Sequence, residues 1–378
     1  MNKKEINKLS KLVIIGGFLG TGKTTTILSL ARKLLDSGKK IGIVTNDQGS
    51  DLVDTNFLSA NGLEVLAVEG SCFCCSFNEF TEKVAELRKK SEVDVLLCEP
   101  VGSCTDLIAT IFKPLTENRG YILSDFSENF SLSPLVIVAE PKRITRYMKD
   151  NSDSEINYLF QKQLEEANII AVNKCDMYDK AEIDRIKKYL AEKFKGVQVL
   201  EISAKNDINI DVLLEYALGG EFSGNALLDI DYKRYAKAEA ELGWLNLSCL
   251  VASKNGETFD INAKMREYMT KFGGAFSNSD LRESLIAHLK CYAVAQNDFY
   301  KASIVDDLNA NSIDENNIMS GNYKECNIIV NARIKTTPEV LRKVCEENIN
   351  VVFGEFDVKY LNLECFSPKE PMPTFGRK

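Results

Sequence analysis

The sequence predicts an α/β protein with a mostly parallel sheet, followed by a smaller α+β domain. Up to about residue 217, short β-branched runs alternate with amphipathic helical stretches. The runs are apolar almost throughout, which is typical of strands buried on both faces of a parallel sheet. After Leu218 this alternation ends, and a chain of 378 residues is longer than one core usually organises.

Seven segments are predicted to form the strands of the first domain. They are residues 12–15, 41–45, 64–68, 93–98, 135–139, 169–172 and 197–202. Helices are predicted at residues 24–37, which Gly38 ends, and at residues 78–90. Residues 116–134 are polar, and we expect an insertion there rather than a core element.

The predicted domains span residues 1–218 and 243–378, with residues 219–242 as a linker. In the second domain we expect helices at residues 261–271, 279–289 and 338–347. Strands are expected at residues 245–252, 327–334 and 356–365, with an extended stretch at residues 292–304. That order suggests a split βαβ arrangement.

Charge and cysteine content exclude several classes of protein. The net charge of −8 repels phosphate backbones and anionic membranes, so neither nucleic acid nor a membrane is expected as a partner. No apolar stretch approaches the length of a membrane span, and the N-terminal residues lack a cleavage-like site. The 11 cysteines are too irregular for a disulfide framework. We therefore expect a cytoplasmic protein with free thiols.

A phosphate-binding loop is predicted between the first strand and the first helix, where residues 17–24 fit G-x-x-x-x-G-K-[ST]. Gly17 and Gly22 let the backbone N–H groups point at phosphates. Lys23 would reach the β- and γ-phosphates, and Thr24 would offer its hydroxyl to Mg²⁺. The motif predicts a P-loop NTPase domain rather than a chance glycine-rich turn. The other loop residues assigned to the nucleotide are Gly20, Thr21 and Thr25.

Two further loops are predicted to recognise guanine. The strand at residues 169–172 leads into Asn173, Lys174 and Asp176, and the Asp176 carboxylate could accept hydrogen bonds from guanine N1–H and the exocyclic amine. Adenine lacks both donors, so its partners would be left unmatched. The next strand ends in a loop that could present a backbone N–H to guanine O6, formed by Ser203, Ala204 and Lys205. The order of these loops predicts GTP rather than ATP.

Acidic residues at two other strand ends are predicted to face Mg²⁺. Glu99 follows the strand at residues 93–98, and Gly102 could sense the γ-phosphate through its N–H. Asp47 follows residues 41–45 and is a second candidate, with Asp51 more easily explained as a solvated loop residue. Lys23 and Glu99 are the candidate catalytic residues, whereas no residue can be assigned to the attacking water.

Three thiols within four residues, those of Cys72, Cys74 and Cys75, predict a metal site. In an extended segment Cys72 and Cys74 project to one side, while Cys75 needs a local turn to join them. Thiolates suit Zn²⁺, Cu(I) or Co²⁺, and Glu69, Cys104, water or a partner protein could supply a fourth ligand. The alternatives are buried small hydrophobes or a redox pair.

The remaining cysteines and the only histidine are expected to be structural. Cys98 is interpreted as a strand residue that points into the sheet, and His288 as a packed or surface residue on the predicted helix at 279–289. The residues expected to fill core space are Cys249, Cys291, Cys326, Cys345 and Cys365.

Together the motifs GGFLGTGKTT, TNDQG, CFCC, EPVG, NKCD and SAK resemble the CobW/HypB/UreG family of P-loop GTPases, most closely its CobW-like branch, over roughly residues 11–217. The resemblance implies a GTPase that couples nucleotide state to delivery of a metal or metal cofactor. It implies Glu99 as the acid of the second switch and the three clustered cysteines as C-x-C-C metal ligands. The chain differs from the family pattern at Ser71, usually glycine, and at residues 46–49, usually Asn-Glu-Phe-Gly.

Three hypotheses follow. The first is a GTP-hydrolysing metallochaperone for Zn²⁺ or Co²⁺ that serves a client metalloenzyme, with a homodimer left open. The second is a GTP-gated assembly or reactivation factor for a cobalamin- or corrinoid-dependent enzyme, acting through protein contacts. The third is a regulatory GTPase switch without a metal.

Overall fold

The computed structural model describes residues 9–47, 53–119, 126–149, 154–222, 224, 227–276, 286–305 and 313–376. Internal contacts divide the chain into two compact units. The first unit comprises residues 1–48, 58–235 and 371–378, and the second comprises residues 49–57 and 236–370. Two short segments, 49–57 and 371–378, therefore belong to a different unit from their sequence neighbours. The predicted domain limits stay a prediction, but the predicted linker contains a helix, α10 (Tyr232–Glu241).

The first unit is built on an eight-stranded parallel sheet in the order β3-β2-β4-β1-β6-β7-β8, with β5 also paired to β1. Its strands are β1 (Ser10–Gly16), β2 (Ile41–Asp47), β3 (Val65–Glu69), β4 (Val95–Glu99), β5 (Phe130–Leu132), β6 (Val136–Ala139), β7 (Ile169–Val172) and β8 (Gln198–Glu201). All seven predicted strands are confirmed. The predicted insertion is wrong at β5, because Phe130 and Leu132 are buried where this strand pairs with β1.

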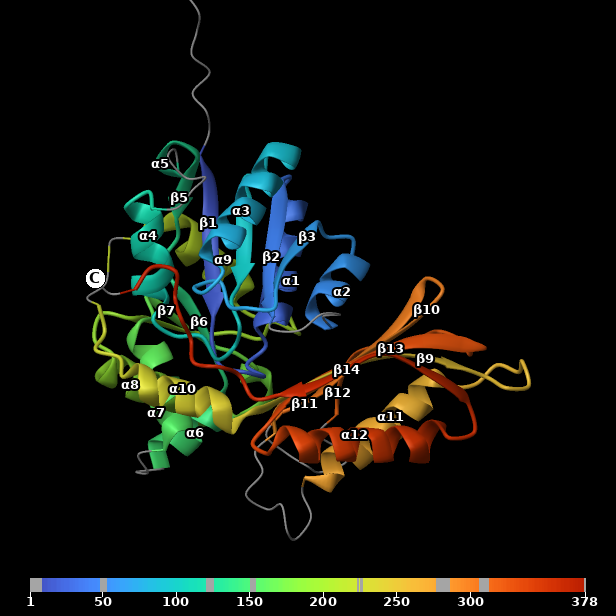
Figure 1. Ribbon diagram of the computed structural model, residues 1–378. Coiled ribbons are helices and arrows are strands. Elements are labelled where there is room, and N and C mark those ends of the chain that lie inside the picture. The colour runs from blue at the N-terminus through green and yellow to red at the C-terminus, as the bar shows by residue number, and fades with distance from the viewer. Residues whose placement is uncertain are drawn as a thin grey trace, which may run out of the picture. The chain divides into compact units, whose positions relative to one another are not determined.

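Helices cover both faces of this sheet (Figure 1). They are α1 (Lys23–Asp36), α3 (Phe77–Ser91), α4 (Lys113–Thr116), α5 (Phe126–Asn129), α6 (Pro141–Lys149), α7 (Glu155–Glu165), α8 (Lys180–Lys193) and α9 (Ile210–Gly219), while α2 (Val53–Ala60) is shared between the units. α1 buries Ile27, Ala31 and Leu34, a three-to-four-residue spacing that places them on one helix face. Because all strands are parallel, their carboxyl ends and the loops that follow gather at one edge of the sheet.

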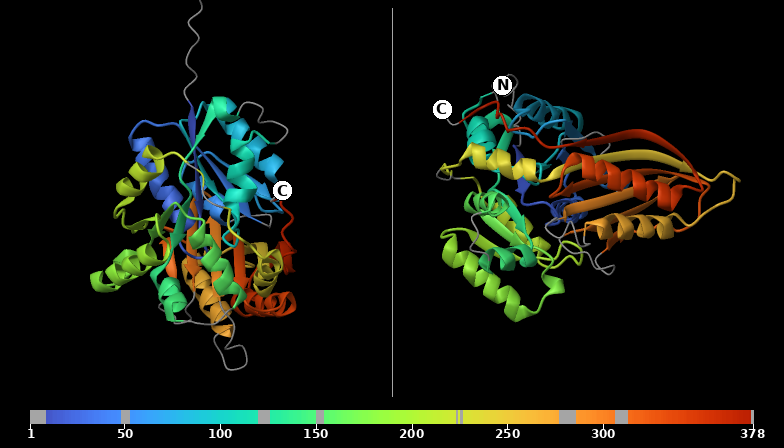
Figure 2. Two further views of the ribbon diagram at one scale, coloured as in Figure 1. Left: turned by 90° about the vertical axis from the view of Figure 1, so that its left-hand side faces the viewer. Right: turned by 60° about the horizontal axis from the view of Figure 1, so that its bottom comes forward.

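The second unit is a six-stranded antiparallel sheet in the order β12-β11-β10-β13-β9-β14. Its strands are β9 (Gly243–Ala252), β10 (Ile286–Ala295), β11 (Asp298–Ile304), β12 (Asp314–Asn317), β13 (Glu325–Ile334) and β14 (Asp357–Phe366). Helices α11 (Ile261–Ala275) and α12 (Pro338–Phe353) cover one face (Figure 2). Strands β9 and β10 flank β13, and β13 and β14 flank β9, which confirms the split βαβ arrangement.

The predicted helix at residues 279–289 is wrong for residues 286–289, which begin strand β10, while residues 277–285 lie outside the described residues. Ile286 and Leu289 have helical spacing, but Ala287 and His288 between them are buried as well. A strand covered on both faces produces this pattern, and periodicity alone does not separate it from a helix. His288 is therefore a buried strand residue.

The first residues of α2 are fixed to the sheet of the second unit. Asp54 forms ion pairs with Lys290 and, at 3.7 Å, with Lys301. Burial by itself raises the pKa of Asp54, but the charges of Lys290 and Lys301 outweigh it, so that this pKa lies well below its usual range. The Val53 N–H donates to Asn331 Oδ1 at 3.0 Å. The chain is thus anchored directly after residue 52.

Candidate nucleotide and metal site

The loop after β1 adopts a backbone that requires glycine. The φ angles of Gly17, Gly20 and Gly22 are 132°, 76° and 92°. A Cβ at Gly17 would lie 2.2 Å from the Val138 carbonyl oxygen, and one at Gly22 would lie 2.4 Å from Asn173 Nδ2. The loop therefore folds tightly against β6 and against the Asn173 side chain, and it leads directly into the N-terminus of α1, where anions bind.

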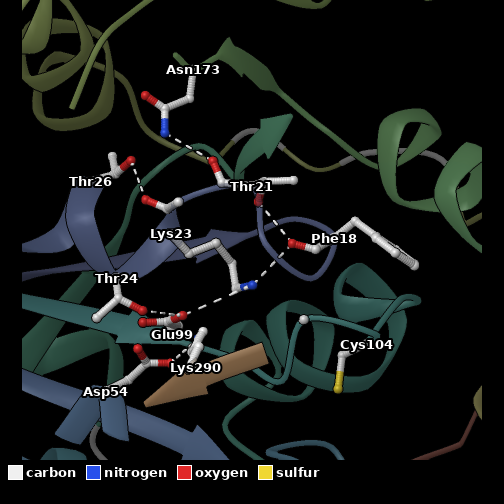
Figure 3. A network of polar contacts seen from close by, with 12 residues as sticks. Phe18, Thr21, Lys23, Thr24, Thr26, Asp54, Glu99, Cys104, Asn173 and Lys290 are labelled. Carbon is white, nitrogen blue, oxygen red and sulfur yellow. Dashed lines mark hydrogen bonds and ion pairs between the residues drawn. The ribbon is translucent and has the colours of Figure 1, made fainter. Parts of the chain in front are cut away.

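Lys23, Thr24 and Glu99 come together at the start of α1 (Figure 3). Lys23 Nζ donates to the Phe18 carbonyl oxygen at 3.3 Å and lies 4.0 Å from Glu99 Oε1. The Thr24 hydroxyl donates to the same carboxylate oxygen at 3.1 Å. A Cβ at Gly102 would lie 2.8 Å from Lys23 Nζ and 3.2 Å from Leu19 Cα, so this loop packs closely on the phosphate loop. Hydroxyl and carboxylate oxygens are the ligands that Mg²⁺ prefers, and the donor set fits that ion.

The other residues predicted to bind the nucleotide or Mg²⁺ lie inside the loop, in the first turn of α1 or at the end of β2. The Thr21 hydroxyl donates to the Phe18 carbonyl oxygen at 2.8 Å, inside the loop. Thr25 is half-buried in the first turn of α1. The backbone of Asp47 ends β2, whereas its side chain and residues 48–52, with Asp51 among them, lie outside the described residues.

Asn173 connects the loops of the nucleotide site to one another. Its Nδ2 donates to the Thr21 carbonyl oxygen at 2.9 Å, and its Oδ1 accepts from the Ala204 N–H at 3.0 Å. Both ends of the amide are thus engaged within the protein, and so is the Ala204 N–H, which belongs to the loop predicted to present a backbone N–H to guanine O6. In this structure Asn173 positions the phosphate loop and the loop after β8.

Asp176 is exposed, and a residue that the motif analysis missed orients it. Its Oδ2 accepts from Asn206 Nδ2 at 2.9 Å, while the Asn206 N–H donates to Ser203 Oγ at 3.2 Å. The spacing of Ser203 and Asn206 is that of a local serine turn, which is the available sequence signal. Lys174 adopts φ 61°, and its ammonium lies 3.4 Å from Glu140. Lys205, which lies beside Asn206 on the loop after β8, is exposed.

The loop after Glu99 is held by the end of α7, which the sequence analysis also missed. Gln163 Nε2 donates to the carbonyl oxygens of Gly102 at 3.0 Å and Cys104 at 2.8 Å. The buried Glu166 carboxylate accepts from the Thr105 hydroxyl at 3.0 Å, the Leu107 N–H at 2.7 Å and the Ile108 N–H at 3.4 Å. These contacts fix the loop that the γ-phosphate is expected to move.

Glu166 should make stability depend on pH. Burial, and then the charge of Asp106, raise the pKa of Glu166 from 4.5 to about 8. Between these two values the folded protein holds a proton that the unfolded chain has lost. The free energy of unfolding therefore falls as pH rises through this window, by up to about 1.4 kcal/mol per unit.

We expect Glu166→Gln to flatten that dependence in urea unfolding at pH 5.5, 6.5 and 7.5. Glu165→Gln, which changes a less buried neighbour paired with Lys162, is the matched control. An equal slope in Glu166→Gln and the parent would show that Glu166 ionises normally.

The cysteine loop turns back on itself before α3. The N–H groups of Cys75 and Ser76 donate to the Cys72 carbonyl oxygen at 3.0 and 2.9 Å, which confirms the turn that Cys75 needs. Sγ of Cys74 lies 2.9 Å from that of Cys72 and 3.9 Å from that of Cys75, and all three sulfurs lie within 4.8 Å of one another. A tetrahedral Zn²⁺ with bonds of about 2.3 Å needs sulfurs about 3.8 Å apart, so small shifts complete the site.

Asn46, near the end of β2, holds the cysteine loop in place. Its Nδ2 donates to the carbonyl oxygens of Val68 at 3.0 Å and Ser71 at 2.6 Å. Its Oδ1 accepts from the Phe73 N–H at 2.7 Å, so one buried amide brackets Cys72 on both sides. No local motif assigns this role to Asn46, because its contacts span more than twenty residues.

Hydrogen bonds raise the pKa of two of the three clustered thiols, those of Cys74 and Cys75. Hydrogen bonding to Cys104, then to Cys72 and Cys75, raises the pKa of Cys74 well above its ordinary value. Hydrogen bonding to Cys72 is the main reason why the pKa of Cys75 rises to about 11. A metal must therefore displace protons to bind. Cys104 is buried, and its loop follows Glu99.

The cysteines predicted to be structural are mostly buried. Cys98 lies inside β4, where burial raises its pKa, and this prediction is confirmed. Cys365 is half-buried, and the fully buried members of the second unit are Cys249, Cys291, Cys326 and Cys345.

None of the helices in the described part of the chain combines the length and apolarity that a membrane crossing needs.

The family model of the CobW/HypB/UreG nucleotide-binding domain matches residues 11–201. The zinc chaperone CobW of Pseudomonas aeruginosa is 26% identical over 235 residues, which cover 54% of this chain and 60% of that protein. The zinc chaperone YeiR of Escherichia coli is 30% identical over 177 residues, which cover 44% of this chain and 47% of that protein.

This chain thus matches about 60% of the length of the first of these relatives. Among solved structures, HypB from Helicobacter pylori in complex with nickel is 16% identical, with a TM-score of 0.40. That likeness covers 56% of this chain and 87% of HypB.

Proposed function

The chain belongs to the CobW/HypB/UreG family, and from this premise we propose that it is a GTPase that delivers a metal ion to a client metalloprotein. The proposal has two parts, a nucleotide site and a thiolate metal site. Relatives named zinc chaperones favour Zn²⁺ over Co²⁺ as the ion delivered. The client is a protein that needs this ion.

The nucleotide part uses groups that the fold brings together. Lys23, now bonded to the Phe18 carbonyl oxygen, would turn to the β- and γ-phosphates. Thr24 and Glu99 would hold Mg²⁺, directly and through water. When bound, Mg²⁺ neutralises charge that develops on the phosphates. Asp176 would select guanine, because Asn206 already orients its carboxylate.

The metal part uses Cys72, Cys74 and Cys75, with Cys104 as the fourth ligand. Cys104 is buried and contacts Cys74, and its loop follows Glu99. The loop that senses the γ-phosphate would then carry a metal ligand itself. Four thiolates suit Zn²⁺, and the 11 free thiols agree with a reducing cytoplasm.

One observation carries the coupling between the two parts. The Asn46 amide, one residue before Asp47, holds the backbone on both sides of Cys72. A movement of β2 toward the γ-phosphate would therefore change the position of a sulfur ligand. By population shift, GTP and GDP would stabilise two arrangements with different metal affinities.

We expect Zn²⁺ affinity to differ about tenfold between the GTP- and GDP-bound protein, a coupling of ordinary size. Competition with a chromophoric chelator measures it. In Asn46→Ala the ratio should fall toward one while GTP still binds, because the amide no longer links β2 to the cysteine loop. Asn78→Ala, an exposed position on nearby α3, is the control and should keep the ratio.

A ratio of one in the parent protein would contradict the coupling, and a parent without Zn²⁺ affinity would contradict the metal part. The corrinoid-enzyme hypothesis and the homodimer stay predictions. The corrinoid-enzyme hypothesis would be favoured if a variant without the clustered cysteines still captured a client protein in a nucleotide-dependent way.

A further inference from the structure

Residues 371–376 lie against the cysteine loop, although about 300 residues separate the two segments. The Met372 N–H donates to Cys75 Sγ at 3.2 Å. The Thr374 N–H donates to the Cys74 carbonyl oxygen at 2.8 Å, and its hydroxyl donates to the Cys75 carbonyl oxygen at 2.8 Å. Two residues of this segment thus contact the backbone or sulfur of two metal ligands.

An aromatic contact completes the attachment. The Phe375 ring meets the Phe77 ring edge-on, with centroids 5.1 Å apart. Phe77 is fully buried and begins α3, directly after the cysteine loop. Pro371 and Pro373 restrict the backbone of the segment, so docking costs it little conformational entropy.

The contacts between residues 371–376 and the cysteine loop are few enough to break reversibly. Residues 371–376 form no helix or strand, and Met372, Thr374 and Gly376 are exposed. A few hydrogen bonds and one ring contact stabilise the docked position only modestly. The segment can therefore leave the cysteine loop without disturbing the sheet of the first unit.

We propose that residues 371–376 form a reversible cover on the cysteine loop, which slows the entry and release of the metal. This inference rests on the proposed function and adds the regulation of its metal site. The Met372 N–H occupies one side of the Cys75 sulfur, the least buried of the three. An acceptor of the metal has to reach Cys75 past this segment.

Thiol modification and metal release test the cover in the full chain. We expect Thr374→Ala/Phe375→Ala to raise the rate at which iodoacetamide modifies Cys75 in the metal-free protein by about tenfold, because hydroxyl and ring contacts are both lost. Release of bound Co²⁺ to excess chelator should accelerate similarly. Lys369→Ala/Glu370→Ala, which changes exposed residues just before the segment, should leave both rates unchanged.

Thr374→Ser keeps the hydroxyl and should keep the protection, which separates docking from a general loss of structure. Equal Cys75 modification rates in Thr374→Ala/Phe375→Ala and the parent would overturn the cover. A parent that binds neither Zn²⁺ nor Co²⁺ would instead overturn the proposed metal function, while the modification rates would still decide whether the cover exists.

Discussion

Lys23→Ala should lower the affinity for GTP and GDP by about 10²- to 10³-fold, because charge-assisted hydrogen bonds to phosphates are each worth about 1.5–3 kcal/mol. Lys23 is the cation at the centre of the loop, 93% of its side chain is buried, and it lies 4.0 Å from the Glu99 carboxylate. Without it, the phosphates would face Glu99 with less compensation. Hydrolysis should be lost as well, since Lys23 is expected to contact the γ-phosphate that is cleaved.

Titration with a fluorescent GDP analogue measures this affinity. Lys188→Ala removes an exposed lysine of α8 and serves as the control for the charge change. Gly22→Ala should give a similar loss by a different route, because its Cβ would collide with Asn173. Unchanged affinity in Lys23→Ala would exclude the loop after β1 as the phosphate site.

Local sequence patterns predicted the first unit well. The strands at residues 41–45 and 169–172 are short apolar runs with clear ends, and burial on both faces is the physical reason for such runs. The helix predicted at residues 279–289 failed at its end for the same reason, because β10 is also covered on both faces and its apolar run imitates a helix.

The site residues were predictable where they belong to a local motif or end a strand of the parallel sheet. Lys23, Thr24 and Glu99 meet as expected, because strand ends converge in a parallel sheet. The groups that position them were not predictable, since Asn46 and Glu166 act on segments 20 to 60 residues away. Such contacts form only when the chain folds and brings distant segments together, so no local spacing in the sequence predicts them.

The cysteine loop receives contacts from two sides of the sequence. Asn46 holds its first half from β2, and Thr374 holds its second half from the end of the described chain. The first contact suits transmission of nucleotide state, and the second suits control of access. Asn46 and Thr374 contact backbone groups of the loop, whereas the Met372 N–H contacts the Cys75 sulfur itself.

Cys72→Ser/Cys74→Ser/Cys75→Ser should lower Zn²⁺ affinity by about 10³-fold or more, because thiolates supply most of the binding free energy at such sites. Serine hydroxyls stay protonated and are harder ligands, so they do not replace thiolates. GTP affinity should change less than about twofold, since the turn at Cys72 is held by backbone atoms and by Asn46.

Chelator competition measures the Zn²⁺ affinity, and the charge-transfer absorption of bound Co²⁺ reports the number of thiolates. Cys104→Ser should lower that absorption by about a quarter if four thiolates bind. Cys365→Ser, a half-buried cysteine of the second unit, should not change it. The GTP affinity of the same preparation shows whether the triple variant is folded. A folded triple variant that bound Zn²⁺ like the parent would place the metal elsewhere in the chain.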